Sequence, residues 1–268
     1  MNEKHFENFV VPRLDIKEVL KESISIYKAG FKPLFMLSCV IFIVNFFNNI
    51  IDFVVNLYKS NTTAYLVSIL LTLVIFGINI YISSRAGIGI YILAEKFLRE
   101  RELTAKEAYA NSRSVFWRYV GVAILFGIIL VLPMMGIFIS YKYINNIVLK
   151  YCVMSLLATP AAYLGIRYGF APISAILKVE KHKYFETSKL IVEGDFWRIL
   201  ILVLLSSIIF IVPYQIYIRV LLDYSKMGDL HKFISSSVNQ FMFVFTTPFS
   251  YIVSVDMYLT LKRNKRIG

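Results

Sequence analysis

Long apolar stretches alternate with short polar connections along the whole chain. Each of six stretches has about 18 or more residues, which is enough to cross a bilayer core of about 30 Å as a helix. They cover residues 33–55, 64–94, 116–140, 147–177, 197–221 and 239–261. The pattern predicts an all-α integral membrane protein with six transmembrane helices in one polytopic membrane domain that spans residues 1–268.

Three of the polar connections carry apolar residues at helical spacing, which predicts a short amphipathic helix before each odd-numbered span. The first connection begins at Asp15, a favourable N-cap residue. The second begins at Thr104, with Glu107 three residues later, which is the capping-box pattern. The third ends at Gly194, which we expect to cap the helix at its C-terminus.

One phrase occurs twice: Phe-Trp-Arg, a mostly apolar run and a proline, over 116–133 and 196–213. Together with Phe31-Lys32-Pro33 it marks the entry of three helical hairpins. We therefore expect three tandem repeats, at about 15–95, 104–177 and 184–262. Each repeat begins and ends on the same side of the membrane, so the repeats are parallel and related by an axis along the membrane normal. Pro133 and Pro213 are expected to end or kink their spans.

Composition agrees with this class, because 58% of the residues are hydrophobic and 17% are charged. Soluble domains are about 45–50% apolar and about 25% charged. The first 23 residues are polar and charged, so we expect no secretory signal peptide there and expect the first span to remain as an anchor.

The basic residues indicate an orientation. Of 29 lysines and arginines, 21 lie in the N-terminal segment, two connections and the C-terminal tail that share one side, and six lie in the opposite loops. This bias predicts that the protein lies in the cell membrane with both termini on the cytoplasmic side. The net charge of +12 favours anionic lipid headgroups, although topology anchoring alone explains it. We do not expect nucleic-acid binding, because no soluble basic domain is present.

Aromatic and basic residues at the entry of the hairpins are expected to act as interfacial anchors. They are Trp117, Arg118, Trp197 and Arg198. Tryptophan is favoured at the membrane surface, and arginine extends its charge toward lipid phosphates.

Ionisable residues that lie well inside the apolar stretches include Arg85, Arg167 and Asp256. Such residues are expensive in a membrane and commonly functional. In one interpretation, the two arginines occupy matching places in two repeats and form a cluster with Asp256 that holds a lipid headgroup, another anion or an internal ion pair. In the other interpretation, the arginines are anchors that reach the cytoplasmic surface separately.

The chain resembles the membrane domain of some bacterial glycerophosphoryl diester phosphodiesterases and related bacterial membrane proteins of uncharacterised function. The residues that carry the resemblance are Arg167, Ala171-Pro172, Glu180, Ser188, Gly194 and Phe196-Trp197-Arg198. Near the C-terminus the chain has Tyr258 and a basic run, with Thr260 where the family pattern places an aspartate. The resemblance implies the multi-span architecture.

The phosphodiesterases carry a separate catalytic barrel of about 250 residues, for which this chain has no room. The three histidines are scattered, and no nucleotide-binding, hydrolase or zinc-protease motif is present. We therefore expect a non-enzymatic membrane protein without metal or cofactor, a scaffold or accessory protein that binds lipid or a protein partner at the cytoplasmic face. The alternative is a transporter or permease subunit for a small or anionic solute, which includes peptide export or immunity.

Overall fold

The structure is a computed structural model that describes residues 13–57, 62–177, 183–216 and 228–265. Every regular element in these ranges is an α-helix. The helices are α1 (Ile16–Ala29), α2 (Phe31–Leu57), α3 (Thr62–Leu98), α4 (Ala105–Tyr143), α5 (Ile147–Tyr168), α6 (Ala171–Ile176), α7 (Tyr184–Val192), α8 (Phe196–Ile216) and α9 (Asp229–Asn264).

Five segments of the described chain are long enough and apolar enough to cross a membrane: Phe31–Val55, Thr72–Leu98, Ala105–Tyr143, Ile147–Ile176 and Phe233–Asn264. This confirms the expectation of an all-helical, multi-pass membrane protein. The fourth segment consists of α5, a two-residue turn and α6. The predicted span 197–221 falls on α8, whose apolar part among the described residues is the shorter segment Phe196–Ser206. Residues 217–221 of that span lie outside the described residues. The sixth span therefore stays a prediction.

Two predicted boundaries differ from the structure. The helix expected at Thr104 and the span expected at 116–140 form one continuous helix, α4, which runs through Pro133 to Tyr143. Its 39 residues reach about 58 Å at a rise of 1.5 Å per residue, which exceeds the bilayer core. The span expected at 147–177 is instead divided, because the chain turns at Gly169 and Phe170 before α6 begins.

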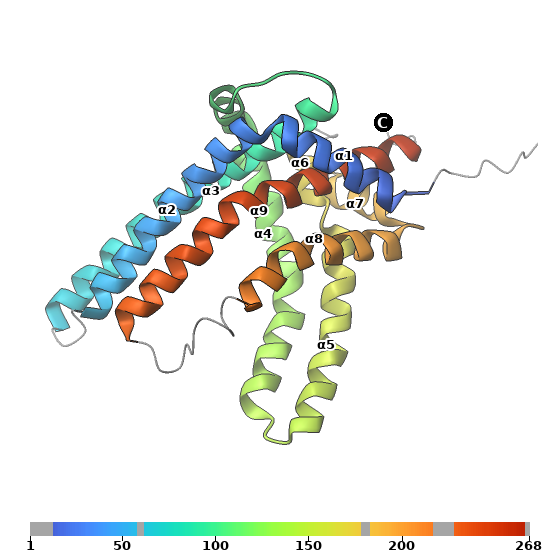
Figure 1. Cartoon of the computed structure of the whole chain (residues 1–268). Coiled ribbons are helices and arrows are strands. Elements are labelled where there is room, and N and C mark those ends of the chain that lie inside the picture. Colours follow the sequence, from blue (N-terminus) through green and yellow to red (C-terminus); the bar gives the residue numbers. More distant parts are fainter. Residues whose placement is uncertain (1–12, 58–61, 178–182, 217–227, 266–268) are drawn as a thin grey trace, which may run out of the picture.

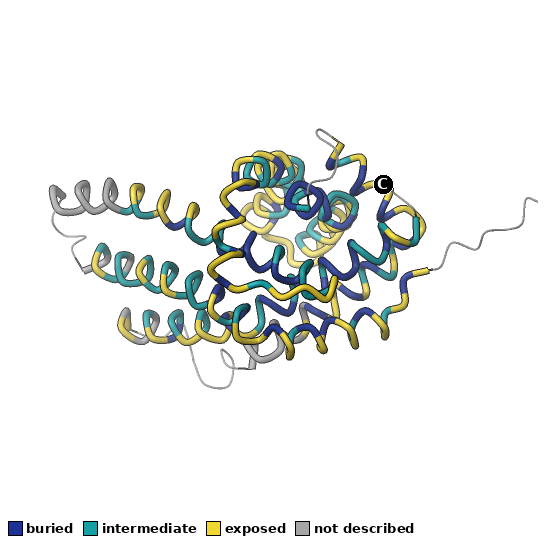
Figure 2. The backbone as a smooth tube through the Cα atoms, turned by 90° about the horizontal axis from the view of Figure 1, so that it is seen from above, coloured by how far each residue is buried: buried dark blue, intermediate teal, exposed yellow. Residues whose placement is uncertain are grey.

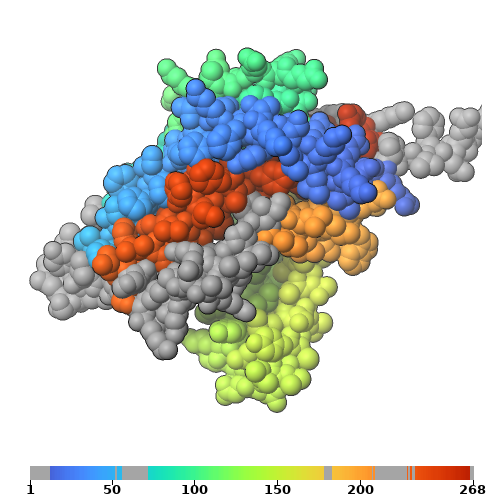
Figure 3. Space-filling view, viewed as in Figure 1, coloured from blue at the N-terminus to red at the C-terminus, as the bar shows by residue number. Residues whose placement is uncertain are grey.

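The helices diverge from a shared end of the molecule (Figure 1). One arm contains α2, α3 and α9, and the other is the hairpin of α4 and α5. Figure 3 shows α9 lying against α2 along the first arm. The shorter helices α1, α6 and α7 and the first turns of α8 gather at the shared end. Buried residues concentrate there, whereas the arms are mostly exposed or half-buried (Figure 2).

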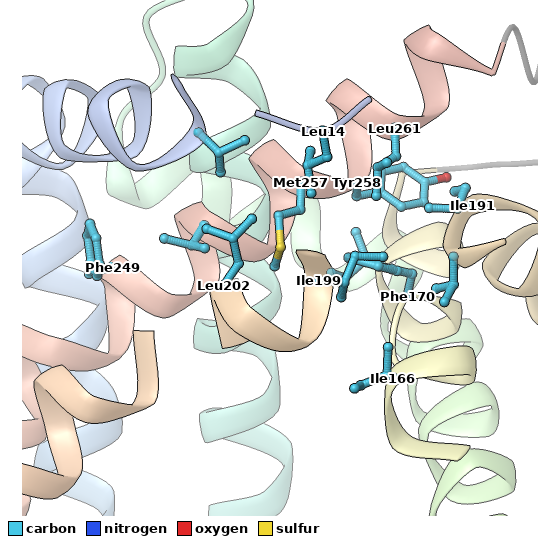
Figure 4. Close-up of a cluster of buried hydrophobic side chains, with 14 residues drawn as sticks. Leu14, Ile166, Phe170, Ile191, Ile199, Leu202, Phe249, Met257, Tyr258 and Leu261 are labelled. Atoms are coloured by element: carbon cyan, nitrogen blue, oxygen red, sulfur yellow. The ribbon is translucent and has the colours of Figure 1, made fainter. Parts of the chain in front are cut away.

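The largest apolar cluster lies at the shared end (Figure 4). It joins Leu14, which precedes α1, to Phe170, Ile191, Ile199 and Tyr258 from four other parts of the chain. All five side chains are buried. Burial of such a side chain away from water stabilises a fold by about 1.5–3 kcal/mol. The cluster thus fixes how α7, α8 and α9 meet.

The first arm is joined by polar side chains within its apolar surfaces. Asn49 Nδ2 of α2 donates to Ser236 Oγ of α9 at 3.1 Å, and Gln240 Nε2 donates to Asn49 Oδ1 at 3.2 Å. Asn79 of α3 donates to Asn45 of α2 at 3.5 Å. Within lipid, apolar burial gives helices little reason to associate, and each interhelical hydrogen bond adds about 0.6 kcal/mol. These bonds therefore help to define the packing of α2, α3 and α9.

The predicted helix ends are confirmed at three places. The Asp15 carboxylate accepts from the backbone N–H of Lys17 at 2.8 Å, as an N-cap does. Thr104 and Glu107 form the complete capping box at the start of α4. Gly194 follows α7 with φ of +85°, a left-handed conformation that favours glycine.

Candidate functional site

Arg85 is enclosed by the neighbouring helix α4. Its Nε donates to Ser112 Oγ at 3.1 Å, and its Nη2 donates to the Tyr109 carbonyl at 2.7 Å. Nη1 donates to the Tyr81 hydroxyl at 3.3 Å, one turn earlier on α3. The guanidinium carbon also lies 4.2 Å from the centroid of the Tyr109 ring, a cation–π distance. Each of the three donor atoms has a partner, so Arg85 joins α3 to α4.

Arg167 repeats part of this arrangement on α5. It follows Tyr163 by four residues, as Arg85 follows Tyr81, and it donates to the Tyr163 hydroxyl. Its guanidinium carbon lies 5.4 Å from the centroid of the Tyr163 ring. Within the described chain the guanidinium has no second hydrogen-bond partner, and its Nε is buried without one. Among the described residues, the Arg167 guanidinium is therefore hydrogen-bonded only within its own helix.

Tyr81 and Tyr163 also make equivalent contacts with an aromatic ring of the next repeat. We use the word seam for the contact between the last long helix of one predicted repeat and the first long helix of the next. At the α3–α4 seam, the Tyr81 and Phe116 rings are 4.9 Å apart. At the α5–α8 seam, Tyr163 and Phe196 are 5.7 Å apart. The tyrosine before each arginine thus packs on the phenylalanine of the repeated phrase.

The four predicted anchors divide into two kinds. The side chains of Trp117 and Trp197 are 78% and 72% exposed, as expected of residues that face lipid or its surface. Arg198 instead donates to the Leu14 carbonyl at 2.7 Å, and Arg118 lies 3.5 Å from the Ala175 carbonyl. The arginines therefore also tie the spans to the shared end, a role that the sequence did not indicate.

A hollow of about 200 Å³ lies beside Arg167. It is lined by Tyr163, Arg167, Lys189, Val192, Glu193, Gly194 and Phe196. Two cationic groups, one carboxylate and a phenol hydroxyl thus surround it. The pair of cations outweighs the single carboxylate, so the hollow suits an anion that accepts hydrogen bonds. We call this hollow the Arg167 pocket.

The course of the chain after α7 explains why this pocket is open. Ser112 lies four residues before Phe116, within the continuous helix α4, and so reaches the Arg85 side chain. Ser188 lies eight residues before Phe196, with the turn at Gly194 between them. Its hydroxyl donates to the Arg167 carbonyl at 2.8 Å and leaves the guanidinium without a serine partner.

Lys265 holds the end of α7 in place. Its Nζ donates to the carbonyls of Leu190 at 3.0 Å, Ile191 at 2.8 Å and Glu193, and it lies 3.9 Å from the Asp195 carboxylate. A cation is favourable at a helix C-terminus, where the carbonyls lack partners. Burial lowers the pKa of Lys265, while Asp195 and Glu193 oppose that shift. Lys265 thus supports the turn that lines the Arg167 pocket.

Asp256 has hydrogen-bond partners different from those of the two arginines. Its buried carboxylate accepts from Ser23 of α1 at 3.1 Å and from Thr260 at 3.3 Å. No hydrogen bond or ion pair among the described residues joins Arg85, Arg167 and Asp256 to one another. Each of the three predicted site residues therefore has its own partners, and Asp256 connects α1 to α9.

Sequence reasoning found Arg167 but missed the other members of its pocket. In the sequence, Lys189 and Glu193 resemble surface charges of an amphipathic helix, and Gly194 resembles a helix C-cap. The signal that was available is the spacing of Ser188, which is four residues farther from Phe196 than Ser112 is from Phe116. Glu180, one of the residues behind the resemblance, lies outside the described residues.

In the described part of the chain, no three His, Cys, Asp or Glu side chains group as metal ligands would. Cys39 and Cys152 are free thiols.

Comparisons of the chain with protein-family models, with curated proteins and with solved structures found no match. The function must therefore be argued from the geometry of the site.

Proposed function

We propose that this chain is a non-enzymatic integral membrane protein, a scaffold that binds an anionic lipid headgroup in the Arg167 pocket at the cytoplasmic face. The observation that carries the proposal is the pairing of Arg167 and Lys189 around one hollow of about 200 Å³. Arg167 has a single hydrogen-bond partner there, so its guanidinium retains donors for a ligand. A guanidinium binds phosphate through two parallel hydrogen bonds, and lysine adds a point charge.

The position of the pocket agrees with a lipid ligand. Phe196 lines it, and the adjacent Trp197 is 72% exposed, as suits a residue at the surface of a bilayer. From the basic residues of the connections we infer that this end of α5 faces the cytoplasm, where anionic lipids gather. A lipid phosphate would therefore be available at the depth of the pocket.

We propose a scaffold because the three predicted repeats contact one another in a ring. The α3–α4 and α5–α8 seams are closed by Tyr81 on Phe116 and Tyr163 on Phe196. A third contact closes the ring between α9 and α2, where the Phe245 and Phe35 rings are 5.4 Å apart. The matched tyrosine–phenylalanine contacts at the first two seams support the repeat, while other residues make the third contact. We propose that this ring of contacts forms the frame for partners at the cytoplasmic face.

A second candidate function is solute transport, and one observation favours it. A cavity of about 170 Å³ between α2 and α9 is lined by Ser38, Asn45, Gln240 and Thr247 among apolar residues. The Ser38 hydroxyl and the Gln240 carbonyl oxygen are buried without a partner. Polar atoms in this state suit bound water or a small polar solute. Saturable flux of a solute into vesicles that contain the purified protein would favour this function over the scaffold.

The test of the proposal compares phosphatidylglycerol with phosphatidylcholine, bound to the full chain in detergent and measured by native mass spectrometry. We expect Arg167→Met to weaken phosphatidylglycerol binding about tenfold, the equivalent of one charge-assisted hydrogen bond. Arg113→Met removes the same charge from an exposed position of α4 and should leave binding unchanged. Equal affinity for the two lipids, or equal behaviour of the two variants, would contradict the proposal.

A further inference from the structure

A second hollow, of about 390 Å³, lies on the neighbouring face of α5. Its walls come mainly from α5, with Ala162, Gly165 and Ile166, and from α8, with Val203 and Leu204. Residues of α3, α6 and α9 also contribute to the lining. Tyr163 and Arg167, which line the Arg167 pocket, alternate along α5 with Ala162 and Ile166. Successive helix residues point about 100° apart, so the two hollows lie on adjoining faces of the same turns.

We propose that this α5–α8 groove holds the acyl chain of the lipid whose phosphate occupies the Arg167 pocket. The inference rests on the proposed function and extends it, because it assigns the ligand as a diacyl glycerophospholipid and not as a free anion. Such a lipid places a negative phosphate directly beside hydrocarbon. The chain offers the same order, with two cations in one hollow and an apolar groove on the next face of α5.

Small residues leave this groove unfilled. A Cβ atom added at Gly165 would meet no atom within 4 Å. At Gly89 of α3, by contrast, a Cβ would lie 2.9 Å from Leu37 Cδ1 of α2. Close packing therefore consumes the space beside Gly89, whereas Gly165 faces volume that another molecule can occupy.

The chemistry of the groove fits hydrocarbon. Nearly all of the side chains that line it are aliphatic or aromatic. Its serine, Ser254, already donates to the Ser250 carbonyl at 2.8 Å within α9. None of the described residues that line it is charged, so a ligand that extends from the Arg167 pocket into the groove meets apolar surface only at its own apolar end. An acyl chain satisfies this condition, and a soluble phosphate compound does not.

The first experiment fills the groove and leaves the cationic pocket intact. We expect Gly165→Leu to weaken the binding of dioleoyl phosphatidylglycerol to the detergent-purified full chain about tenfold. Gly127→Leu is the matched control, because a Cβ at Gly127 of α4 also meets no atom within 4 Å, outside the groove. Leu204→Trp fills the groove from the opposite wall and replaces Gly165→Leu if that variant does not fold. Binding equal to that of the Gly127→Leu control overturns the inference.

A second arm uses the unaltered protein and two probes. Dioleoyl phosphatidylglycerol should bind at least about tenfold more tightly than glycerol 3-phosphate, which carries the phosphate without acyl chains. Equal affinities overturn the inference. Gly165→Leu should leave glycerol 3-phosphate binding unchanged. If Arg167→Met leaves the binding of both probes unchanged, the proposed function itself fails. If Arg167→Met weakens binding but Gly165→Leu does not, only the acyl-chain assignment fails.

Discussion

Arg85 and Arg167 follow a tyrosine at the same spacing, and each tyrosine packs on the next Phe-Trp-Arg phrase, yet the two arginines have different surroundings. The guanidinium of Arg85 is bonded at three atoms, two of them to α4. Among the described residues, the guanidinium of Arg167 is bonded only to Tyr163, and it borders a hollow. Matching sequence positions thus produce a helix clamp at one seam and an open cationic pocket at the other.

The difference originates in the helix that follows each arginine. A continuous helix carries Ser112 and Tyr109 directly over Arg85. At the other seam the left-handed turn at Gly194 separates α7 from α8, and Ser188 binds backbone atoms. The backbone of the helix that faces each arginine therefore determines whether its guanidinium is fully hydrogen-bonded. The same substitution at Arg85 and at Arg167 should have unequal effects.

The largest effect is expected from Arg85→Met. Loss of three hydrogen bonds from a cation should lower the free energy of unfolding by about 2–4 kcal/mol, since such bonds contribute about 1.5–3 kcal/mol each and do not add fully. Arg167→Met should cost about 1 kcal/mol or less, because one bond to an exposed tyrosine is lost. Unfolding in mixed micelles with increasing dodecyl sulfate measures both values. Equal losses would show that the two sites are equivalent after all.

A smaller effect is expected at the turn that distinguishes the two seams. Gly194→Ala places a Cβ on a residue with φ of +85°, which costs about 1–2 kcal/mol. Gly121→Ala, in open space on α4, should instead stabilise the protein by about 0.5–1 kcal/mol, because alanine favours helix. The same unfolding assay should give opposite signs for the two variants. A neutral Gly194→Ala would mean that the turn does not need its left-handed conformation.

The smallest effect concerns the pH dependence of Lys265. Burial lowers its pKa from the ordinary 10.5, so the unfolded chain binds more protons between the lowered pKa and 10.5. The free energy of unfolding should therefore rise with pH across that window. Lys265→Met should lose this rise, and the difference between the two unfolding curves isolates it from tyrosine ionisation. A difference that does not change with pH in this window would argue against a lowered pKa.

Local chemistry made part of the fold predictable. Asp15, Thr104 with Glu107, and Gly194 each act within a few residues of their own position, and each is found as expected. Five of the expected spans could also be recognised from length and apolar content. Whether a helix continues or breaks depends on packing between helices, and the sequence therefore did not predict the continuity of α4 or the break at Gly169.

The candidate site was predictable only as single residues. Arg167 stands out because a charge in an apolar stretch is rare. For Arg85 one interpretation named Asp256 as a partner, whereas its guanidinium bonds to Ser112, Tyr109 and Tyr81. The rotation of α3 that points Arg85 at Ser112, and not at α9, depends on how whole helices pack. Lys189 gave no signal, since a lysine on a polar helix resembles any other surface charge until the turn at Gly194 brings it beside α5.

The hydrogen bond between Ser23 and Asp256 joins residues 233 positions apart. Leu14, at the start of the chain, likewise accepts a hydrogen bond from Arg198 through its carbonyl and packs in the cluster with Tyr258. A ribosome adds about 5–20 residues per second, so α1 waits at least roughly ten seconds after its synthesis before α9 exists. Until then the part of α1 that packs on α9 lacks that partner, although Ile26 can already join the cluster with Leu34 and Leu93. The hydrogen bond between Ser23 and Asp256 can thus form only after α9 has been synthesised.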